Sequence, residues 1–473
     1  MVDETLIARA QLPLQFAGRA RAPARTVWET ANSRATGLVG LQESRPGDCV
    51  EAGVGMTEGV VSGTTARPGG SDVSEAMTSR ERVLLALAHR EPDRVPVSFG
   101  DPCFSSIFDH APHGYRALCR LTGLADAPEP ISSTDDGGSV LNVDERLKLR
   151  FGADLRWLAA GSSFEWEQLP DGGVRDDWGL VRHKIGSYWD LDDNAAPLRS
   201  AETIADVEAY PHWPDTKDPA IWTGKREEAQ AIRDAGFAVL AVPNTAMQIF
   251  HNYAFLRGFG QWLMDQVDDP AFHHAFSEKL TDWAVAYLQA FLAPIADLVD
   301  LVMMGEDMGT QRAPFMRPEA YREFCKPYHR RWVEAVHRIA PNAKVALHTC
   351  GAVFPIIPDF IEIGVEVLNP VQPLATSMEP WRLKREFGAD LSFLGGVDIQ
   401  ELLPHGTPEQ VREGVKELID TYGPGGGFVL APSHQFQPDV PPENIVAMYD
   451  AALEFGRYPL GAGGSSATAG GRR

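Results

Sequence analysis

Cysteine is scarce in this sequence: five occur among 473 residues, at irregular spacings. An odd number without a regular pattern implies no disulfide framework, and this usage favours a reducing cytoplasm. The sequence also lacks a run of about 18 apolar residues, the length that a membrane-spanning helix needs. These two absences exclude a small disulfide-stabilised protein and argue against a protein embedded in the membrane.

Positive charge is in short supply as well. There are 43 Lys and Arg residues against 65 Asp and Glu residues, so the net charge is −22 at pH 7. Such a surface repels phosphate backbones and anionic lipids, and we expect neither nucleic acid nor a membrane as the main partner. The content of hydrophobic residues, 44%, is ordinary for a soluble globular protein with a large core.

The two ends of the chain differ from its middle. Residues 1–76 contain clusters of Gly, Ser and Thr without helical or strand periodicity. We predict a disordered N-terminal extension there, or a true start at Met77. Residues 461–473 are rich in Gly, Ser and Ala and are predicted to be a disordered tail. Residues 77–460 are predicted to form one domain.

Short apolar runs alternate with helical patterns through this domain. Thr78 and Glu81 have the spacing of a capping box at the start of a helix. The predicted strands are 94–100, 237–242, 298–304, 345–347, 365–368, 391–394 and 428–431. The predicted helices include 318–339, 354–363, 379–387, 408–422 and 442–455. Strands that are apolar throughout are typical of a parallel sheet covered on both faces, and the alternation predicts an α/β fold.

Two α/β architectures fit this pattern. A Rossmann or flavodoxin-like sheet is disfavoured, because no Gly-x-Gly-x-x-Gly motif directly follows the first strand. About seven or eight strand–helix units favour a (β/α)8 TIM barrel, whose active site is built at the C-terminal ends of the strands. The stretch from about 150 to 225 departs from the alternation and is rich in tryptophan. We expect an insertion of short hairpins and loops there, either a lid beside the barrel mouth or a plain surface excursion.

The sharpest chemical signal is the pair His348-x-Cys350, which follows a predicted strand. Side chains two residues apart on a strand point the same way, so an imidazole and a thiolate can bind one metal ion. Glu306 and His434 also follow predicted strands and should lie on the same rim. Together these four residues form a plausible zinc ligand set. The alternative is that His348 and Cys350 are structural residues beside the turn at Gly351.

Other polar residues at strand ends have two interpretations each. Asp398 could anchor a substrate or orient a metal ligand, or it could cap the helix that follows. Asn244, Asn369 and Gln372 could form hydrogen bonds with a substrate, or could cap loops.

Several of these segments together resemble the uroporphyrinogen decarboxylase superfamily. The resemblance extends from Met77 to about Pro459 and is carried by residues 77–83, 91–97, 256–259, 305–309, 348–351, 395–398 and 434–444. It implies a (β/α)8 barrel, in agreement with the alternation of strands and helices. It also implies one of two chemistries, either decarboxylation of a tetrapyrrole or methyl transfer.

The true decarboxylases of this superfamily carry an Arg-Gln-Ala-Gly-Arg motif just after the first strand. Here residues 98–106 read Ser-Phe-Gly-Asp-Pro-Cys-Phe-Ser-Ser, without an arginine. A substrate with eight carboxylates would meet no guanidinium group at this place. The sequence therefore looks closer to the zinc-dependent methyltransferases that work with corrinoids.

That branch has a His-x-Cys zinc motif, which His348 and Cys350 match. The third ligand position falls at His434, which the resemblance leaves open between a zinc ligand and a substrate contact. Glu306 matches an acidic position that could complete the metal shell. The resemblance implies that Glu306, His434 and Asp398 take part in catalysis, and that Asn244, Asn369, Gln372 and Asp398 orient the substrate.

The expected function is therefore zinc-dependent transfer of a methyl group between a small O-, N- or S-methyl compound and a corrinoid carried by a partner protein. The alternatives are uroporphyrinogen decarboxylation and a non-catalytic barrel that binds a tetrapyrrole or corrinoid. We expect a cytoplasmic protein, and the sequence leaves a homodimer open.

Overall fold

The computed structural model describes residues 77–101, 104–131, 139–164, 166–185 and 188–460. The predictions for residues 1–76 and 461–473 lie outside these ranges. Within them, none of the helices combines the length and apolar character needed to cross a bilayer.

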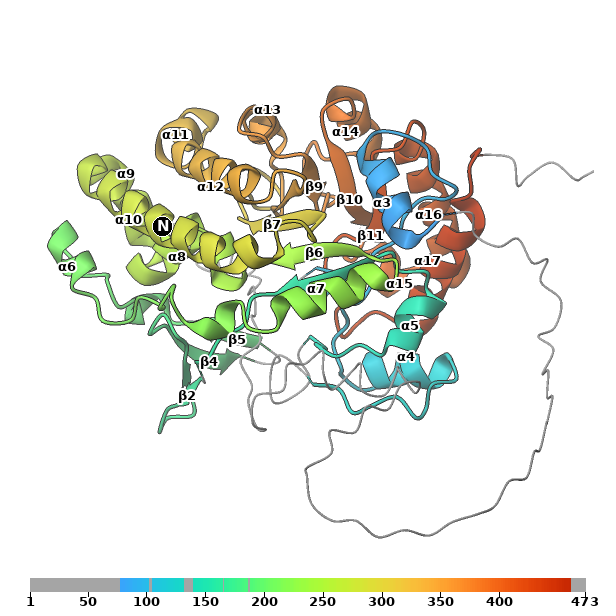
Figure 1. Ribbon diagram of the computed structural model, residues 1–473, viewed down its shortest axis with the longest axis horizontal. Helices are drawn as coiled ribbons and strands as arrows, with labels where there is room; N and C mark the ends of the chain where they lie inside the picture. The colour runs from blue at the N-terminus through green and yellow to red at the C-terminus, as the bar shows by residue number, and fades with distance from the viewer. Residues whose placement is uncertain (1–76, 102–103, 132–138, 165, 186–187, 461–473) are drawn as a thin grey trace, which may run out of the picture.

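A curled sheet of seven parallel strands forms the centre of the molecule (Figure 1). Its order is β1-β6-β7-β8-β9-β10-β11, so strands that follow one another in this sheet along the chain also lie side by side. The strands are β1 (Leu155–Ala159), β6 (Ala238–Val242), β7 (Leu301–Gly305), β8 (Lys344–His348), β9 (Val367–Asn369), β10 (Ser392–Val397) and β11 (Phe428–Pro432). Strands β6, β7, β10 and β11 are buried along their whole length, as their apolar sequences predict.

The segment around Val97 connects the two edges of this sheet. Val97 forms parallel bridges with Ala153, just before β1, and with Leu430 of β11. The Ser98 amide donates to the Leu430 carbonyl at 2.9 Å, and the Asp154 amide donates to the Val97 carbonyl at 2.8 Å. This segment therefore takes the place between the edge strands, which gives a TIM-barrel-like arrangement.

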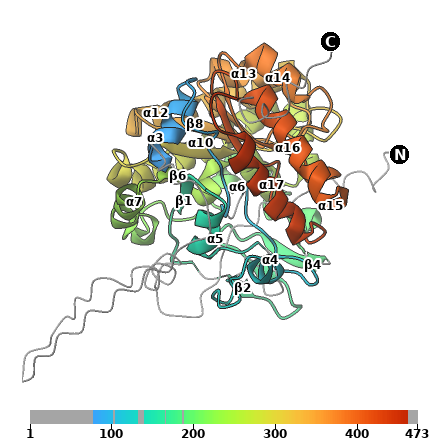
Figure 2. The ribbon, with the colours of Figure 1, turned by 90° about the vertical axis from the view of Figure 1, so that its right-hand side faces the viewer.

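Helices cover the outside of the sheet (Figure 1). Helix α7 packs on β6, α12 on β8 and α16 on β10, and α16 and α17 lie side by side (Figure 2). The longer helices are α3 (Ser79–Leu87), α7 (Lys225–Asp234), α8 (Phe250–Arg257), α9 (Phe259–Asp268), α10 (Pro270–Leu292), α12 (Lys326–Ile339), α14 (Pro380–Phe387), α16 (Pro408–Tyr422) and α17 (Pro442–Phe455). The shorter ones are α4 (Tyr115–Leu121), α5 (Glu145–Arg150), α6 (Ile204–Glu208), α11 (Pro318–Phe324), α13 (Ile357–Glu362) and α15 (Leu402–His405).

Helix α3 lies at the N-terminal ends of the strands. Arg80 of α3 pairs with Asp300, which directly precedes β7, at 3.0 Å. The capping box predicted at its start is confirmed, because the Glu81 amide donates to Thr78 Oγ1 and the Thr78 amide donates to the Glu81 carboxylate. With α3 at this end, the opposite end of the sheet is left for a site.

The tryptophan-rich stretch divides into two parts. β1 lies within it and belongs to the main sheet, so the predicted insertion does not begin at residue 150. A separate antiparallel sheet follows, with β2 (Glu167–Gln168), β3 (Val174–Arg175), β4 (Val181–Ile185) and β5 (Tyr188–Leu191). Trp178, between β3 and β4, is buried against Trp213 and against Trp283 of α10, with ring centroids 5.5 and 4.5 Å away. These three tryptophans form a packed cluster. The role of the insertion as a lid stays a prediction.

Candidate metal centre

The residues that the sequence analysis singled out lie at one end of the sheet. β7 is followed by Glu306 and Asp307, β8 ends at His348, and β9 ends at Asn369. His434 comes two residues after β11. Because the strands are parallel, all these positions lie at the C-terminal edge, where barrel enzymes build their active sites.

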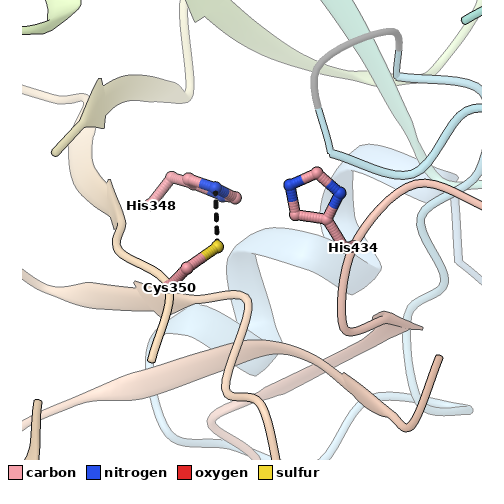
Figure 3. Close-up of side chains that lie close together, drawn as sticks. All are labelled: His348, Cys350 and His434. Carbon is pink, nitrogen blue, oxygen red and sulfur yellow. Dashed lines mark hydrogen bonds between the residues drawn. The ribbon is translucent and has the colours of Figure 1, made fainter. Parts of the chain in front are cut away.

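Three of these side chains converge on one point. His348, Cys350 and His434 each offer a ligand atom, and these atoms all lie within 4.8 Å of one another (Figure 3). His348 Nε2 and Cys350 Sγ are 3.5 Å apart, and all three side chains are buried. Two imidazoles and one thiol form a donor set that suits Zn²⁺. Of the four predicted ligands, the structure brings these three together.

The protonation of His348 is fixed by its neighbour Asn369. His348 Nδ1 lies 2.6 Å from Asn369 Oδ1, and Asn369 Nδ2 donates to the Leu394 carbonyl at 2.9 Å. The amide oxygen can only accept, so Nδ1 carries the proton. Nε2 therefore keeps its lone pair, and it is the nitrogen nearest to Cys350. Asn369 was predicted to contact a substrate, but its side-chain amide is already bonded to His348 and to the Leu394 carbonyl.

His434 has the properties expected of a metal ligand. Its Nδ1 is buried and has no hydrogen-bond partner among the described residues. Burial, and after it the charge of His348, lowers the pKa of His434 to about 4, so the ring is neutral at neutral pH. A buried polar nitrogen without a partner is costly, and a bound metal ion would satisfy it. The residues present therefore fit zinc.

Asp307 is a carboxylate beside this cluster that was not among the residues predicted from the sequence. Its Oδ1 accepts from the Cys350 amide at 2.8 Å and lies 3.7 Å from His348 Nε2. Burial would raise the pKa of Asp307, but the charges of His348 and His251 lower it. Burial, and then Asp307, raises the pKa of the Cys350 thiol well above its usual value. A cation bound between them would reverse this effect and favour the thiolate.

Glu306, predicted as a fourth ligand, is placed elsewhere. Its carboxylate accepts from the amides of Ile249 and of Phe250 (2.8 Å) and from His251 Nδ1 (3.0 Å), at the start of α8. Burial opposes its ionisation, but the imidazoles of His251 and His329 lower the pKa of Glu306 to about 2. Neighbouring residues at the end of a strand point to opposite sides, so Asp307 reaches the cluster and Glu306 does not.

Asp398 binds main-chain amides of the turn that leads into α15, which is close to the capping role that was its alternative interpretation, although the N-cap residue of α15 is Glu401. Its Oδ1 accepts from the Gln400 amide at 3.0 Å, and its Oδ2 accepts from the amides of Glu401 at 2.9 Å and Leu402 at 2.8 Å. These bonds occupy both carboxylate oxygens and hold the turn between β10 and α15. A direct role for Asp398 in catalysis or substrate binding stays a prediction without a contact that favours it.

The two remaining predicted substrate contacts link loops. Asn244 Nδ2 donates to the Ala160 carbonyl at 2.6 Å, which connects the ends of β6 and β1. Gln372 Oε1 accepts from the Gly351 amide at 3.0 Å and from Gln311 Nε2 at 2.6 Å. Gln372 thus holds the turn that follows Cys350, and its effect on the site is indirect.

Phe104 is a further residue of the site that sequence reasoning did not find. Its ring lies 4.5 Å from the His348 ring between centroids, and its side chain is buried. It comes from the loop after the Val97 segment, far from β8 in the sequence. No local pattern distinguishes Phe104 from any other apolar residue.

Comparison with known proteins places this geometry in context. Residues 245–455 match the family described as uroporphyrinogen decarboxylase (URO-D). The methylated-thiol–coenzyme M methyltransferase of Methanosarcina mazei is 27% identical over 279 residues, which cover 58% of this chain and 70% of that protein. The uroporphyrinogen decarboxylase of Pseudoalteromonas translucida is 24% identical over 285 residues, covering 57% of this chain and 74% of that protein.

A solved structure of a methyltransferase from Methanosarcina mazei has a similar fold. The TM-score is 0.52 at 19% sequence identity, and the match covers 80% of this chain and 99% of the other. His348, Cys350 and His434 all lie within the residues that match the family, so the candidate metal centre belongs to the region of similarity.

Proposed function

Because this chain belongs to the uroporphyrinogen decarboxylase superfamily and is an enzyme on its methyltransferase side, we propose that it is a zinc-dependent methyltransferase or demethylase. In this proposal a methyl group moves between a small O-, N- or S-methyl compound and a corrinoid carried by a partner protein. The observation that carries the proposal is the buried cluster of His348, Cys350 and His434. The decarboxylation alternative requires no metal ion, whereas the proposed methyl transfer uses zinc as a Lewis acid.

In the proposed centre, zinc would be held by His348 through Nε2, by Cys350 through Sγ and by His434 through a ring nitrogen. Bound zinc would supply a Lewis acid for the negative charge on the substrate heteroatom. In the demethylating direction, the bond between the methyl carbon and the heteroatom breaks, and its electron pair stays on the heteroatom. The reduced cobalt of the corrinoid co-substrate provides the pair for the new bond to the methyl group.

The chain's own residues prepare this step. Asn369 keeps His348 in one protonation form, and Asp307 holds the Cys350 amide. We assign Asp307, and not Glu306, as the acidic residue of the centre. The Phe104 ring covers one side of His348 and keeps water from it. A site assembled before the substrate arrives has little reorganisation left for the reaction itself.

Metal analysis combined with a methyl-transfer assay tests the proposal. We expect purified wild-type protein to hold about one zinc per chain, and His348→Ala and Cys350→Ser to hold far less. Cys325→Ser is a matched control, because Cys325 is a buried free cysteine that lies beside Met316 and is not part of the cluster. The activity readout is the methylation of cob(I)alamin by O-, N- and S-methyl compounds, followed by absorbance. Wild-type protein that keeps no zinc after reconstitution would refute the proposal.

Decarboxylation is the second candidate, because uroporphyrinogen decarboxylases are also among the relatives. The sequence of residues 98–106 contains no arginine to pair with the carboxylates of a tetrapyrrole. Incubation with uroporphyrinogen, followed by porphyrin fluorescence, distinguishes the two activities. Tetrapyrrole or corrinoid binding without turnover, unchanged in Cys350→Ser, would instead indicate a non-catalytic binding barrel.

A further inference from the structure

We propose that Asn369 is a positioning residue of the metal centre, which holds His348 in the one protonation form that offers Nε2 to a metal ion. The inference rests on the proposed function, since it requires the cluster to bind zinc. It gives a defined role to a residue that the sequence had suggested as a substrate contact.

The sheet register places the two side chains together. His348 of β8 and Asn369 of β9 are paired residues in neighbouring parallel strands, so their side chains lie on the same face. Both are buried, and His348 Nδ1 and Asn369 Oδ1 are 2.6 Å apart. Because both side chains are buried, we expect that removal of the amide leaves His348 Nδ1 without an acceptor, which is costly.

A third strand fixes the orientation of the amide. Asn369 Nδ2 donates to the Leu394 carbonyl of β10 at 2.9 Å. If the amide were flipped, its oxygen would face the Leu394 oxygen, and two acceptors would meet in a buried place. The carbonyl of Leu394 thus determines which end of the amide faces His348, and through it which nitrogen of the imidazole carries the proton. Residues of three adjacent strands, β8, β9 and β10, thus determine which nitrogen of His348 is free to bind a metal ion.

The consequence concerns metal affinity. Without the acceptor at Nδ1, the His348 ring can place its proton on Nε2 or rotate, and both changes remove a ligand from the cluster. Loss of such a partner of a metal-binding histidine typically lowers metal affinity about 10- to 100-fold. The main-chain carbonyl of Asn369 accepts from the Thr349 amide at 2.8 Å, and a side-chain substitution leaves this bond in place. The effect can therefore be assigned to the amide alone.

The test compares three variants by zinc affinity, measured in competition with a chromophoric chelator. Asn369→Leu keeps the approximate volume and removes the acceptor, and we expect the zinc dissociation constant to rise about 10- to 100-fold. Asn369→Asp keeps an acceptor for Nδ1 and should recover most of the loss in zinc affinity, while its second oxygen faces the Leu394 carbonyl and lowers the thermal stability. Asn444→Leu is the matched control, since Asn444 is buried and donates to the carbonyls of Leu403 and Gly406, away from the cluster.

The absorption spectrum of the Co²⁺-substituted protein gives a second readout that a general loss of stability would not change. We expect Asn369→Leu to alter the ligand-field bands, and Asn444→Leu to leave them as in wild type while lowering the thermal stability. Wild-type affinity and spectrum in Asn369→Leu would overturn this inference and leave the proposed function intact. Failure of the wild type itself to bind zinc would refute the proposed function.

Discussion

At the scale of single residues, the turn after Cys350 depends on a glycine. Gly351 has φ of +88°, and a Cβ atom there would fall on the carbonyl oxygen of Gly309. We predict that Gly351→Ala moves Cys350 and weakens zinc binding, and lowers the free energy of unfolding by about 1–3 kcal/mol. Zinc titration and denaturant unfolding measure the two effects.

Gly172 provides the control for that substitution. Its φ of +86° is nearly the same, but nothing lies within 4 Å of the position of a Cβ atom. Gly172→Ala therefore has the backbone strain without the collision, and it should leave zinc affinity unchanged. Equal zinc affinity in both variants would mean that the Gly351 turn does not position Cys350.

Single residues also mark the limit of what the sequence predicted about the site. His348 and Cys350 were recognisable, because an i, i+2 pair at a strand end has a defined geometry. Glu306 and Asp307 are adjacent, and both follow β7. Which of the two side chains faces the cluster depends on the backbone dihedral angles at the end of β7, which the sequence does not specify. Phe104 reaches His348 only through the closure of the sheet, so it has no local signal.

At the scale of elements, Glu306 anchors α8 to the end of β7. Its carboxylate accepts the first amides of the helix and the imidazole of His251. We predict that Glu306→Gln lowers the free energy of unfolding by roughly 2–4 kcal/mol, because a buried charged partner is lost and an amide group faces the helix amides. Zinc affinity should change less than threefold, or about 0.6 kcal/mol. Loss of zinc with unchanged stability would instead restore Glu306 as a metal ligand.

Helix α10 carries a buried histidine that makes stability depend on pH. Burial lowers the pKa of His273 from 6.5 to about 4, although its Nε2 bonds to the Phe324 carbonyl. Between these two pH values the unfolded chain binds a proton that the native chain does not, so the unfolding free energy falls as the pH falls, by up to roughly 3 kcal/mol. Urea unfolding at pH 7 and pH 5 should show a smaller pH dependence in His273→Phe. The exposed His405 serves as the control, and an unchanged slope in His273→Phe would contradict the prediction.

The elements were the most predictable level of the structure. Strands such as β6 and β11 are apolar throughout, and the parallel sheet that buries them follows from that pattern. β1 was not recognised, because Arg156 and Trp157 interrupt its apolar run. Arg156 is accommodated by an ion pair with Glu145 of α5, a contact between elements that periodicity does not report.

At the scale of the whole molecule, one buried carboxylate lies where the two edges of the sheet meet the Val97 segment. Asp154 binds the guanidinium groups of Arg82 and Arg94, each at 2.7 Å, and accepts from the Val97 amide at 2.8 Å. These partners come from α3 and from the segment that lies between the edge strands. Asp154 therefore connects both to the start of β1.

We predict that Asp154→Asn lowers the free energy of unfolding by about 3–5 kcal/mol, because it removes the negative charge that two buried guanidinium groups share. Arg82 keeps its ion pair with Asp93 at 2.6 Å, so Arg94 should account for most of this loss. Asp450→Asn is the matched control: its ion pair with Arg150 is just as short, 2.6 Å, but the side chains of Asp450 and Arg150 are partly exposed, at 38% and 44%. Solvent screens such a pair, so its loss should cost less than about 1 kcal/mol. Denaturant unfolding followed by circular dichroism measures both values. Equal losses in the two variants would mean that the edges of the sheet are held by their main-chain bonds alone, and that the ring would stay closed without the buried charges.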